Sequence, residues 1–217
     1  MSTRPHILLT GFEPFGGDPV NPSALVCQAL HGQPVAHATV HTVELPCVFG
    51  RALQVLDQAL AETSPVLVIA LGLAAGRGEI SVERAALNID DARIPDNAGA
   101  QPVDVPVVPG GPAAWFSTLP VKAIVAALRL AGLPAAVSQT AGTFVCNHVF
   151  YGLQHRLAGS GVRSGFIHVP LIDTQAATHP GQPTLALHDL VRGVHIALEV
   201  ALTHQGADTK IAAGAIA

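Results

Sequence analysis

Cys146 stands where a reactive thiol would be expected. It follows a run of small and hydroxyl residues, 140–143, and opens an apolar helical pattern. A thiol in the first turn of a helix lies at the positive end of the helix dipole, beside unpaired backbone N–H groups, so we expect the thiolate to be favoured there. His168 follows in a short apolar strand pattern, 165–170. A thiol and an imidazole are the minimum apparatus of a cysteine hydrolase, with an inert buried cysteine as the alternative.

Two further groups would have to serve that thiol, a base and a carboxylate that orients it. His148 and His155 share the expected helix with Cys146, but their spacing turns their side chains away from it. His168 lies near the C-terminal end of a strand pattern, where open α/β sheets place ligand sites. Glu83 is a carboxylate in an otherwise apolar strand pattern, which is costly to bury unless it is paired. The alternatives are an outward-facing Glu83 paired with Arg84 or Arg93, and the rival carboxylates Asp90, Asp91 and Asp96.

A glycine-rich turn at 10–17 carries two of the seven phenylalanines, Phe12 and Phe15, directly after a strand pattern. Two rings and flexible glycines can make walls for a flat neutral ligand. A buried turn capped by aromatic rings is the equally open alternative, and the spacing matches neither common phosphate-binding motif. A second glycine-rich segment, 72–78, follows another strand pattern and could present backbone N–H groups to a ligand.

Short apolar runs alternate with amphipathic helical patterns, which predicts an α/β domain. The expected strands are His6–Phe12, His37–Leu45, Pro65–Leu71, Ile80–Ile89, Ala135–Thr140 and Gly165–Leu171. The expected helices are Pro22–Leu30 (capped by Asn21), Phe49–Thr63, Val121–Leu130, Phe144–Leu157 and Leu185–His204. Residues 90–120 form a long Pro/Gly-rich stretch typical of lids and binding loops, parts of which could pair as edge strands. We expect one domain over residues 1–217, with a frayed tail at 206–217.

The composition argues against several functional classes. Hydrophobic residues make up 49% and charged residues 12%, and the net charge is −4, so no basic surface for nucleic acid is expected. No stretch fits a membrane span or a signal peptide. The low charge and the mean hydropathy of +0.44 favour self-association. Cys27, Cys47 and Cys146 have no regular spacing, which favours a reducing cytoplasm over a disulfide framework. No compact His/Cys/carboxylate signature is present, so we expect neither a metal nor another cofactor.

Together these segments resemble the pyroglutamyl-peptidase I family, also called pyrrolidone-carboxylate peptidases. The similarity is carried by the segments Thr10–Gly17, Asn21–Ser23, Glu83–Arg84, Asn88–Asn97, Ala141–His148 and Phe166–Pro170. The resemblance implies a single-domain α/β/α sandwich around a twisted, mostly parallel mixed sheet. It also implies a homo-oligomer, a tetramer or a dimer.

The resemblance also implies the activity, which is hydrolysis of the amide bond after an N-terminal pyroglutamyl residue of a peptide. It assigns the catalytic triad to Glu83, Cys146 and His168, acting through a thioacyl-enzyme. The residues that it places at the substrate are Phe12 and Phe15, around the pyroglutamyl ring, with Asn21, Leu73 and Arg93.

Leu73 departs from the family pattern, in which a glutamine usually follows the glycine at position 72. A leucine side chain neither donates nor accepts a hydrogen bond. This substitution supports the alternative reading, a non-catalytic or degenerate α/β module that binds a small ligand. A serine hydrolase using Ser23, Ser138 or Ser164 would lack the usual Gly-x-Ser-x-Gly turn.

Overall fold

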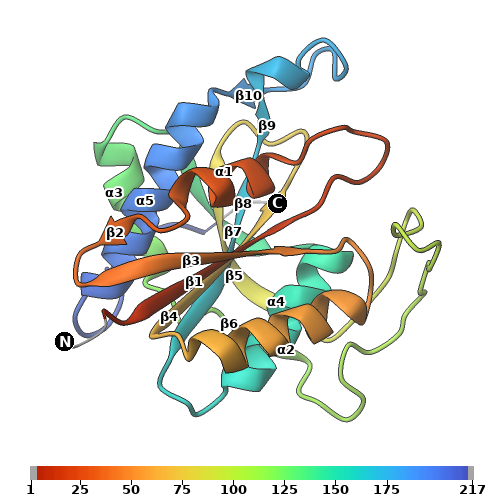
Figure 1. Ribbon diagram of the computed structural model, residues 1–217, viewed down its shortest axis with the longest axis horizontal. Helices are drawn as coiled ribbons and strands as arrows, with labels where there is room; N and C mark the ends of the chain where they lie inside the picture. Colours follow the sequence, from red (N-terminus) through yellow and green to blue (C-terminus); the bar gives the residue numbers. More distant parts are fainter. Residues whose placement is uncertain (1–3, 215–217) are drawn as a thin grey trace.

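A twisted mixed sheet forms the centre of the computed structural model, which describes residues 4–214 (Figure 1). Its strands are β1 (His6–Phe12), β2 (Pro34–Val35), β3 (Ala38–Leu45), β4 (Leu67–Leu73), β5 (Ile80–Leu87), β6 (Ala114–Phe116), β7 (Ala135–Thr140) and β8 (Arg163–Val169). They lie in the order β2-β3-β1-β4-β8-β5-β6, and β7 also pairs with β5. β1, β3, β4 and β8 run parallel, as do β5 and β7, whereas β5 is antiparallel to β8 and to β6. A separate short pair, β9 (Leu171–Ile172) and β10 (Thr184–Leu185), lies beyond β8.

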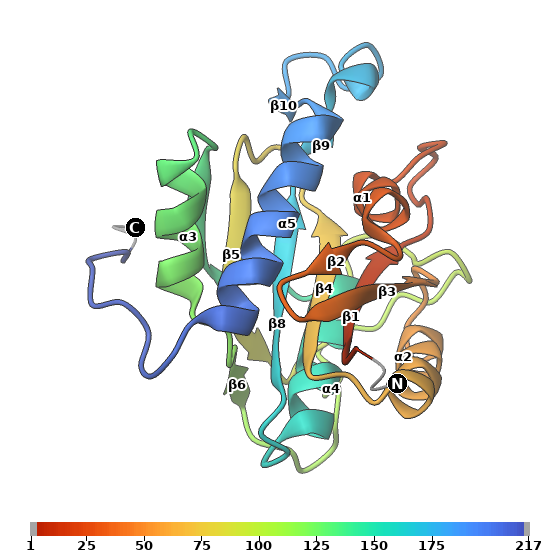
Figure 2. The ribbon, with the colours of Figure 1, turned by 60° about the vertical axis from the view of Figure 1, so that its left-hand side comes forward.

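Helices cover both faces of the sheet (Figure 2). One face carries α1 (Pro22–Leu30), α3 (Val121–Leu130) and α5 (Leu187–Thr203), and the other carries α2 (Arg51–Thr63) and α4 (Val145–Leu157). A single 3₁₀ turn, Asp173–Gln175, follows β9. The predicted α/β/α arrangement is therefore confirmed.

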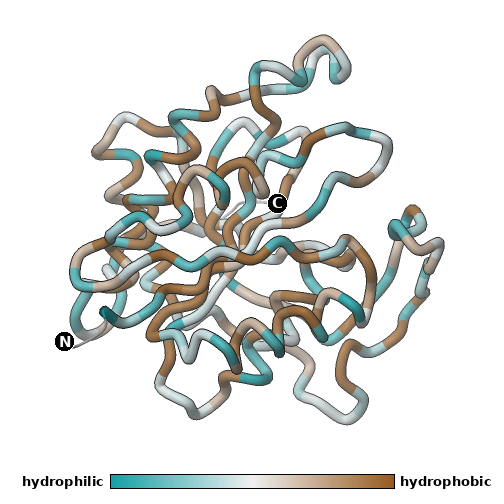
Figure 3. The backbone as a smooth tube through the Cα atoms, viewed as in Figure 1, coloured by the Kyte–Doolittle hydropathy of each residue, from teal (hydrophilic) through white to brown (hydrophobic). Residues whose placement is uncertain are grey.

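The hydrophobic core has two halves, one on each side of the sheet. Alternate residues of β4 divide between them, with Ile69 and Leu71 on the α1/α5 side and Val68 and Ala70 on the α2/α4 side. A strand buried on both faces reads as a nearly continuous apolar run, as β4 does (Figure 3). We call the second side the α2/α4 face, because the candidate active site lies on it.

Most predicted elements lie where the sequence patterns put them. β1, α1, α3 and β7 have the predicted bounds. β8 starts at Arg163 and stops at Val169, because Pro170 lacks the N–H that a continuing ladder needs. Within 90–120, β6 pairs with the edge of β5, and Asp90 bridges to Val105, so part of this stretch does pair as strand.

The segment after α5 has no regular structure up to residue 214, and residues 215–217 of the predicted tail lie outside the described residues. It is nevertheless attached, because the Asp208 carboxylate accepts hydrogen bonds from the Lys122 and Ala123 N–H groups at the start of α3. No helix within residues 4–214 is long and apolar enough to cross a membrane.

Candidate active site

Cys146 is the second residue of α4, which begins at Val145, one residue later than predicted. The N–H groups of the first helical turn, at Val145, Cys146 and Asn147, have no acceptor in a preceding turn and remain available to a ligand. The sulfur packs onto the C-terminal end of β4. A Cβ atom built on Gly72 would lie 2.8 Å from the Cys146 Sγ, so the thiol occupies the space that a side chain at position 72 would fill.

The two residues after Cys146 fix the start of this helix. The Asn147 side chain accepts from the Leu87 N–H at 2.9 Å and donates to the carbonyl groups of Leu87 and Ile89. His148 accepts from the Gly50 N–H at Nε2 (3.0 Å), so its Nδ1 carries the proton donated to Asp90 (2.8 Å). Both nitrogens of His148 are therefore occupied, and it cannot serve as the base.

His168 and Glu83 are brought together on neighbouring strands. The His168 Nδ1 lies 2.7 Å from Oε1 of Glu83, and both side chains are buried. Nδ1 must carry the proton to bond a carboxylate, which leaves Nε2 as the proton acceptor. His168 pairs in register with Gly72 of β4, the residue against which the Cys146 sulfur packs. The structure thus joins His168 to Glu83 by a hydrogen bond, and it packs the Cys146 sulfur against the residue of β4 that pairs with His168.

Burial sets the protonation states in this cluster. It raises the pKa of the Cys146 thiol, and the nearby Cys47 and Glu83 raise it further. Burial lowers the pKa of His168, although the hydrogen bond and charge of Glu83 oppose this. Both shifts favour a neutral thiol and a neutral imidazole in the free protein. The sequence-based expectation of a thiolate fails because desolvation outweighs the helix dipole.

Glu83 is the ionised member of the cluster. Burial would raise its pKa, but the hydrogen bond and charge of His168, together with the neighbouring Ser138 and Arg77, hold it below its usual value. Arg77 was missed from the sequence, since a glycine-rich loop has no periodicity that would reveal its partner. Its Nη1 lies 2.7 Å from Glu83 Oε1, so the arginine that pairs with Glu83 is neither Arg84 nor Arg93, the partners in the alternative of an outward-facing Glu83.

The rival carboxylates do not bond His168. The Asp90 carboxylate accepts from His148, and Asp91 is an exposed residue whose backbone N–H donates to the Thr143 carbonyl. Asp96 accepts from three backbone N–H groups, those of Phe49, Ala98 and Ala100. Glu83 is thus the carboxylate that accepts the hydrogen bond of the His168 imidazole.

A cavity of about 250 Å³ opens beside the first turn of α4. Phe15 and Phe144 contribute rings whose centroids are 6.3 Å apart, and Phe49 meets Phe144 edge-on at 5.4 Å. Ile94 adds an apolar wall, and Arg93 lines the cavity as an exposed side chain. Phe144, which immediately precedes α4, was not singled out from the sequence.

The other predicted substrate residues lie outside this cavity. Phe12 is 2% exposed and packs against Phe166 in the core. Asn21 is buried as the N-cap of α1, where it accepts from the Ser23 N–H and donates to the Glu13 carbonyl. Leu73 ends β4 and is half-buried. In the structure, Asn21 therefore supports the turn that carries Phe15.

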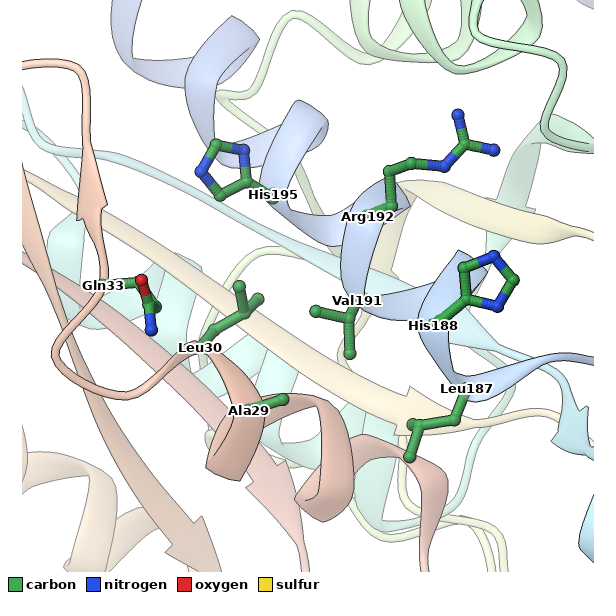
Figure 4. Close-up of a pocket in the computed structure, with 8 residues that line it drawn as sticks. All are labelled: Ala29, Leu30, Gln33, Leu187, His188, Val191, Arg192 and His195. Atoms are coloured by element: carbon green, nitrogen blue, oxygen red, sulfur yellow. The ribbon is translucent and has the colours of Figure 1, made fainter.

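A larger groove, of about 830 Å³, lies on the opposite side of the sheet between α1 and α5 (Figure 4). It is lined by Ala29, Leu187 and Val191, with His188 and His195 beside them, and contains no cysteine. It is therefore separate from the candidate catalytic site. Within residues 4–214, no group of three or more His, Cys, Asp or Glu side chains is arranged to hold a metal ion.

Comparisons with known proteins agree with this geometry. Residues 5–204 match the family described as pyroglutamyl peptidase. A pyrrolidone-carboxylate peptidase of Klebsiella pneumoniae is 59% identical over 96% of this chain and 98% of its own length, and that of Cupriavidus taiwanensis is 58% identical over 92% and 94%.

Solved structures of this family also share the fold. The pyroglutamyl peptidase I of Bacillus amyloliquefaciens superposes with a TM-score of 0.91 at 43% identity, over 94% of this chain and all of that one. The pyrrolidone carboxyl peptidase of Thermococcus litoralis gives 0.92 at 38% identity, over 96% and 99%. Because the family model and these relatives cover most of its length, this chain belongs to the pyroglutamyl peptidase family of cysteine peptidases.

Proposed function

We propose that this protein hydrolyses the amide bond that follows an N-terminal pyroglutamyl residue of a peptide, with Cys146 as nucleophile, His168 as base and Glu83 as the orienting carboxylate. One observation carries the proposal. A buried imidazole, fixed by a 2.7 Å bond to a buried carboxylate, stands in register with the glycine that makes room for the thiol. This is the nucleophile, base and orienter arrangement of triad hydrolases.

Acylation follows from the protonation states. The Cys146 sulfur attacks the pyroglutamyl carbonyl carbon, and its proton passes to His168 Nε2. Glu83 stabilises the resulting imidazolium through Nδ1. The free N–H groups of the first turn of α4 face the developing oxyanion, and each good donor of this kind contributes roughly 3–4 kcal/mol.

The intermediate then collapses. The C–N bond breaks, His168 returns its proton to the leaving amine, and a thioester to Cys146 remains. A water molecule, deprotonated by His168, attacks the thioester and releases pyroglutamate and the free thiol. The thiol and imidazole return to their neutral forms.

The cavity beside α4 suits a neutral ring. Pyroglutamate is a lactam without a free amine, so it needs apolar walls and a few amide partners rather than a carboxylate aimed at an ammonium group. Phe15, Phe144 and Ile94 supply such walls. A site that bonds the lactam C=O rejects proline, which lacks it, because a buried donor would be left unpaired.

The test compares pyroglutamyl, prolyl and alanyl amides of one fluorogenic amine, with and without iodoacetamide. We expect turnover of the pyroglutamyl amide alone, loss of turnover on alkylation of Cys146, and no turnover by Cys146→Ala. Binding of pyroglutamyl peptides without turnover would instead favour the degenerate ligand-binding module that Leu73 suggested. Residual activity above a tenth of wild type in Cys146→Ala would remove the nucleophile assignment.

The same proposal includes a homo-oligomer, as the family resemblance implies, and a location in the cytoplasm, as the cysteine pattern suggests. Cys27, Cys47 and Cys146 are all free, which suits a reducing compartment. Analytical ultracentrifugation tests the assembly, and a monomer at micromolar concentration would contradict it. Fractionation of the native cells tests the location.

A further inference from the structure

Arg77 is a charged side chain that bonds Glu83 and that the family resemblance did not suggest. It lies in the loop between β4 and β5, where its N–H donates to the Ala74 carbonyl and Gly76 adopts a φ of +88°. This tight turn directs the side chain back over β5. The Arg77 side chain is 33% exposed, whereas that of Glu83, its partner, is fully buried.

Arg77 and His168 share a single oxygen of Glu83. Arg77 Nη1 and His168 Nδ1 each lie 2.7 Å from Oε1, and the buried Oε2 has no hydrogen-bond partner among residues 4–214. A buried carboxylate is costly unless it is paired. Because burial lowers the pKa of His168, this imidazole offers Glu83 a hydrogen bond at all times but a positive charge only when it is protonated. Arg77 is therefore the cation that compensates Glu83 before catalysis.

We propose that Arg77 is a positioning residue of this site, which keeps Glu83 ionised and its Oε1 directed at His168, and so sets the pH range in which the thiol and the imidazole react. This inference rests on the proposed triad. Arg77 touches neither the sulfur nor the imidazole by any bond in the structure, and acts through Glu83.

Arg77 lowers the pKa of all three residues of the proposed triad. Its hydrogen bond lowers the pKa of Glu83, and its positive charge lowers the pKa of both His168 and Cys146. The other titratable group facing the thiol is Cys47, which lies before α2 and raises the pKa of Cys146. Removing the charge of Arg77 therefore raises all three pKa values.

The direction of the resulting shift does not depend on the order of proton transfer. If His168 must be neutral to accept the proton, a higher His168 pKa moves the acid limb of the profile of kcat/KM against pH to higher pH. If the thiolate–imidazolium pair is the reactive form, a higher Cys146 pKa moves the same limb to higher pH. A purely structural role for Arg77 would lower the melting temperature, because the buried Glu83 would lose its cation, and would leave this limb in place.

The experiment uses three variants of the full chain. Arg77→Met removes charge and donor, Arg77→Gln keeps a donor without charge, and Arg77→Lys keeps the charge at a different geometry. Arg192→Met, which removes a half-exposed charge on α5, is the control. Each is measured for kcat/KM against pH with the pyroglutamyl amide, for the rate of Cys146 alkylation against pH by peptide mass spectrometry, and for its melting temperature.

We expect Arg77→Met to lose roughly tenfold to a hundredfold in kcat/KM at neutral pH, the range that slight misplacement of a catalytic group produces. Its acid limb should move up by about 0.5 pH unit or more. Arg77→Gln should show the same shift with a smaller loss of rate, and Arg77→Lys should keep the limb near its wild-type position. Arg192→Met should match wild type throughout.

An Arg77→Met enzyme whose acid limb is unmoved, and whose activity follows only its folded fraction, overturns the proposal. The alkylation profile separates this outcome from failure of the proposed function. If wild type does not cleave the amide, the peptidase assignment falls, while the pH dependence of Cys146 alkylation still decides the role of Arg77. An upward shift in Arg77→Met then supports it, and no shift refutes it.

Discussion

Gly72 offers the sharpest test of where the thiol lies. It has an extended backbone that any residue can adopt, so Gly72→Ala adds a methyl group without φ strain. That carbon would lie 2.8 Å from the Cys146 Sγ and 2.8 Å from Cζ of Phe166, whereas ordinary contact begins at 3.4 Å. The sulfur and the ring must therefore each move by 3.4 − 2.8 = 0.6 Å, unless the strand itself shifts.

The expected cost in stability is small. Overpacking of this kind costs about 1–3 kcal/mol, and replacing a strand glycine by alanine returns about 0.5–1 kcal/mol. The expected cost in catalysis is larger, because a misplacement of about 1 Å can lower the rate roughly a hundredfold. For Gly72→Ala we expect kcat/KM to fall roughly tenfold to a hundredfold, with the protein still folded.

Gly165→Ala is the matched control. Its added carbon would clash with Ser117 and Leu119 on the opposite side of the sheet, and it lies in β8 as His168 does. It should lower the melting temperature at least as much as Gly72→Ala, yet keep near wild-type kcat/KM for each mole of folded enzyme. Stopped assays on the pyroglutamyl amide, with circular dichroism melts, measure both quantities. Equal activity losses in the two variants would show that loss of stability, not displacement of the sulfur, explains the result, and the placement of Cys146 against Gly72 would be refuted.

Three further outcomes are expected of the site. His168→Ala should lose at least about a hundredfold in kcat/KM, since general base catalysis contributes about 10²–10⁴-fold, and a loss below tenfold would assign the base elsewhere. Glu83→Gln should lose less, because the amide oxygen still accepts from Nδ1. Its acid limb should move to lower pH, because Glu83 raises the pKa of both His168 and Cys146, and an upward shift in the pH profile would contradict this. Phe15→Ala should chiefly raise KM for the pyroglutamyl amide, whereas Phe12→Ala should chiefly lower the melting temperature, by the equivalent of about 3–5 kcal/mol. A raised KM with unchanged stability in Phe12→Ala would restore that ring to the substrate.

The fold could be predicted from the sequence wherever local patterns and packing agree. α1 begins at Pro22 because Asn21 caps it and proline suits the first helical position, and both signals are visible in the chain. β2 and β6 could not be predicted in the same way. They are two and three residues long, and each depends on pairing with a distant strand rather than on its own pattern.

The site could be predicted from the sequence in its chemistry but not in its full set of contacts. The context of Cys146 at a helix start and of His168 near a strand end is local, so the sequence could single out both as candidates. Which carboxylate meets the imidazole depends on the β5–β8 pairing, which places Ser81, two residues before Glu83, opposite His168. The contact between Arg77 and Glu83 depends on how a loop folds back, for which the chain carries no periodic signal.

Protonation was the property least accessible from the sequence, and it shapes the mechanism most. A cysteine at a helix start suggests a thiolate, yet the sulfur packs between Gly72 and the core, and burial raises its pKa. The imidazole beside it is buried too, with its pKa lowered. Both shifts favour the uncharged forms before the substrate arrives, so they favour a charge separation that develops during the attack itself. Glu83 favours the imidazolium that then forms, while Arg77 opposes it and keeps Glu83 ionised. Their removal should therefore move the acid limb in opposite directions, and a shift of the same sign in both variants would contradict this account of the cluster.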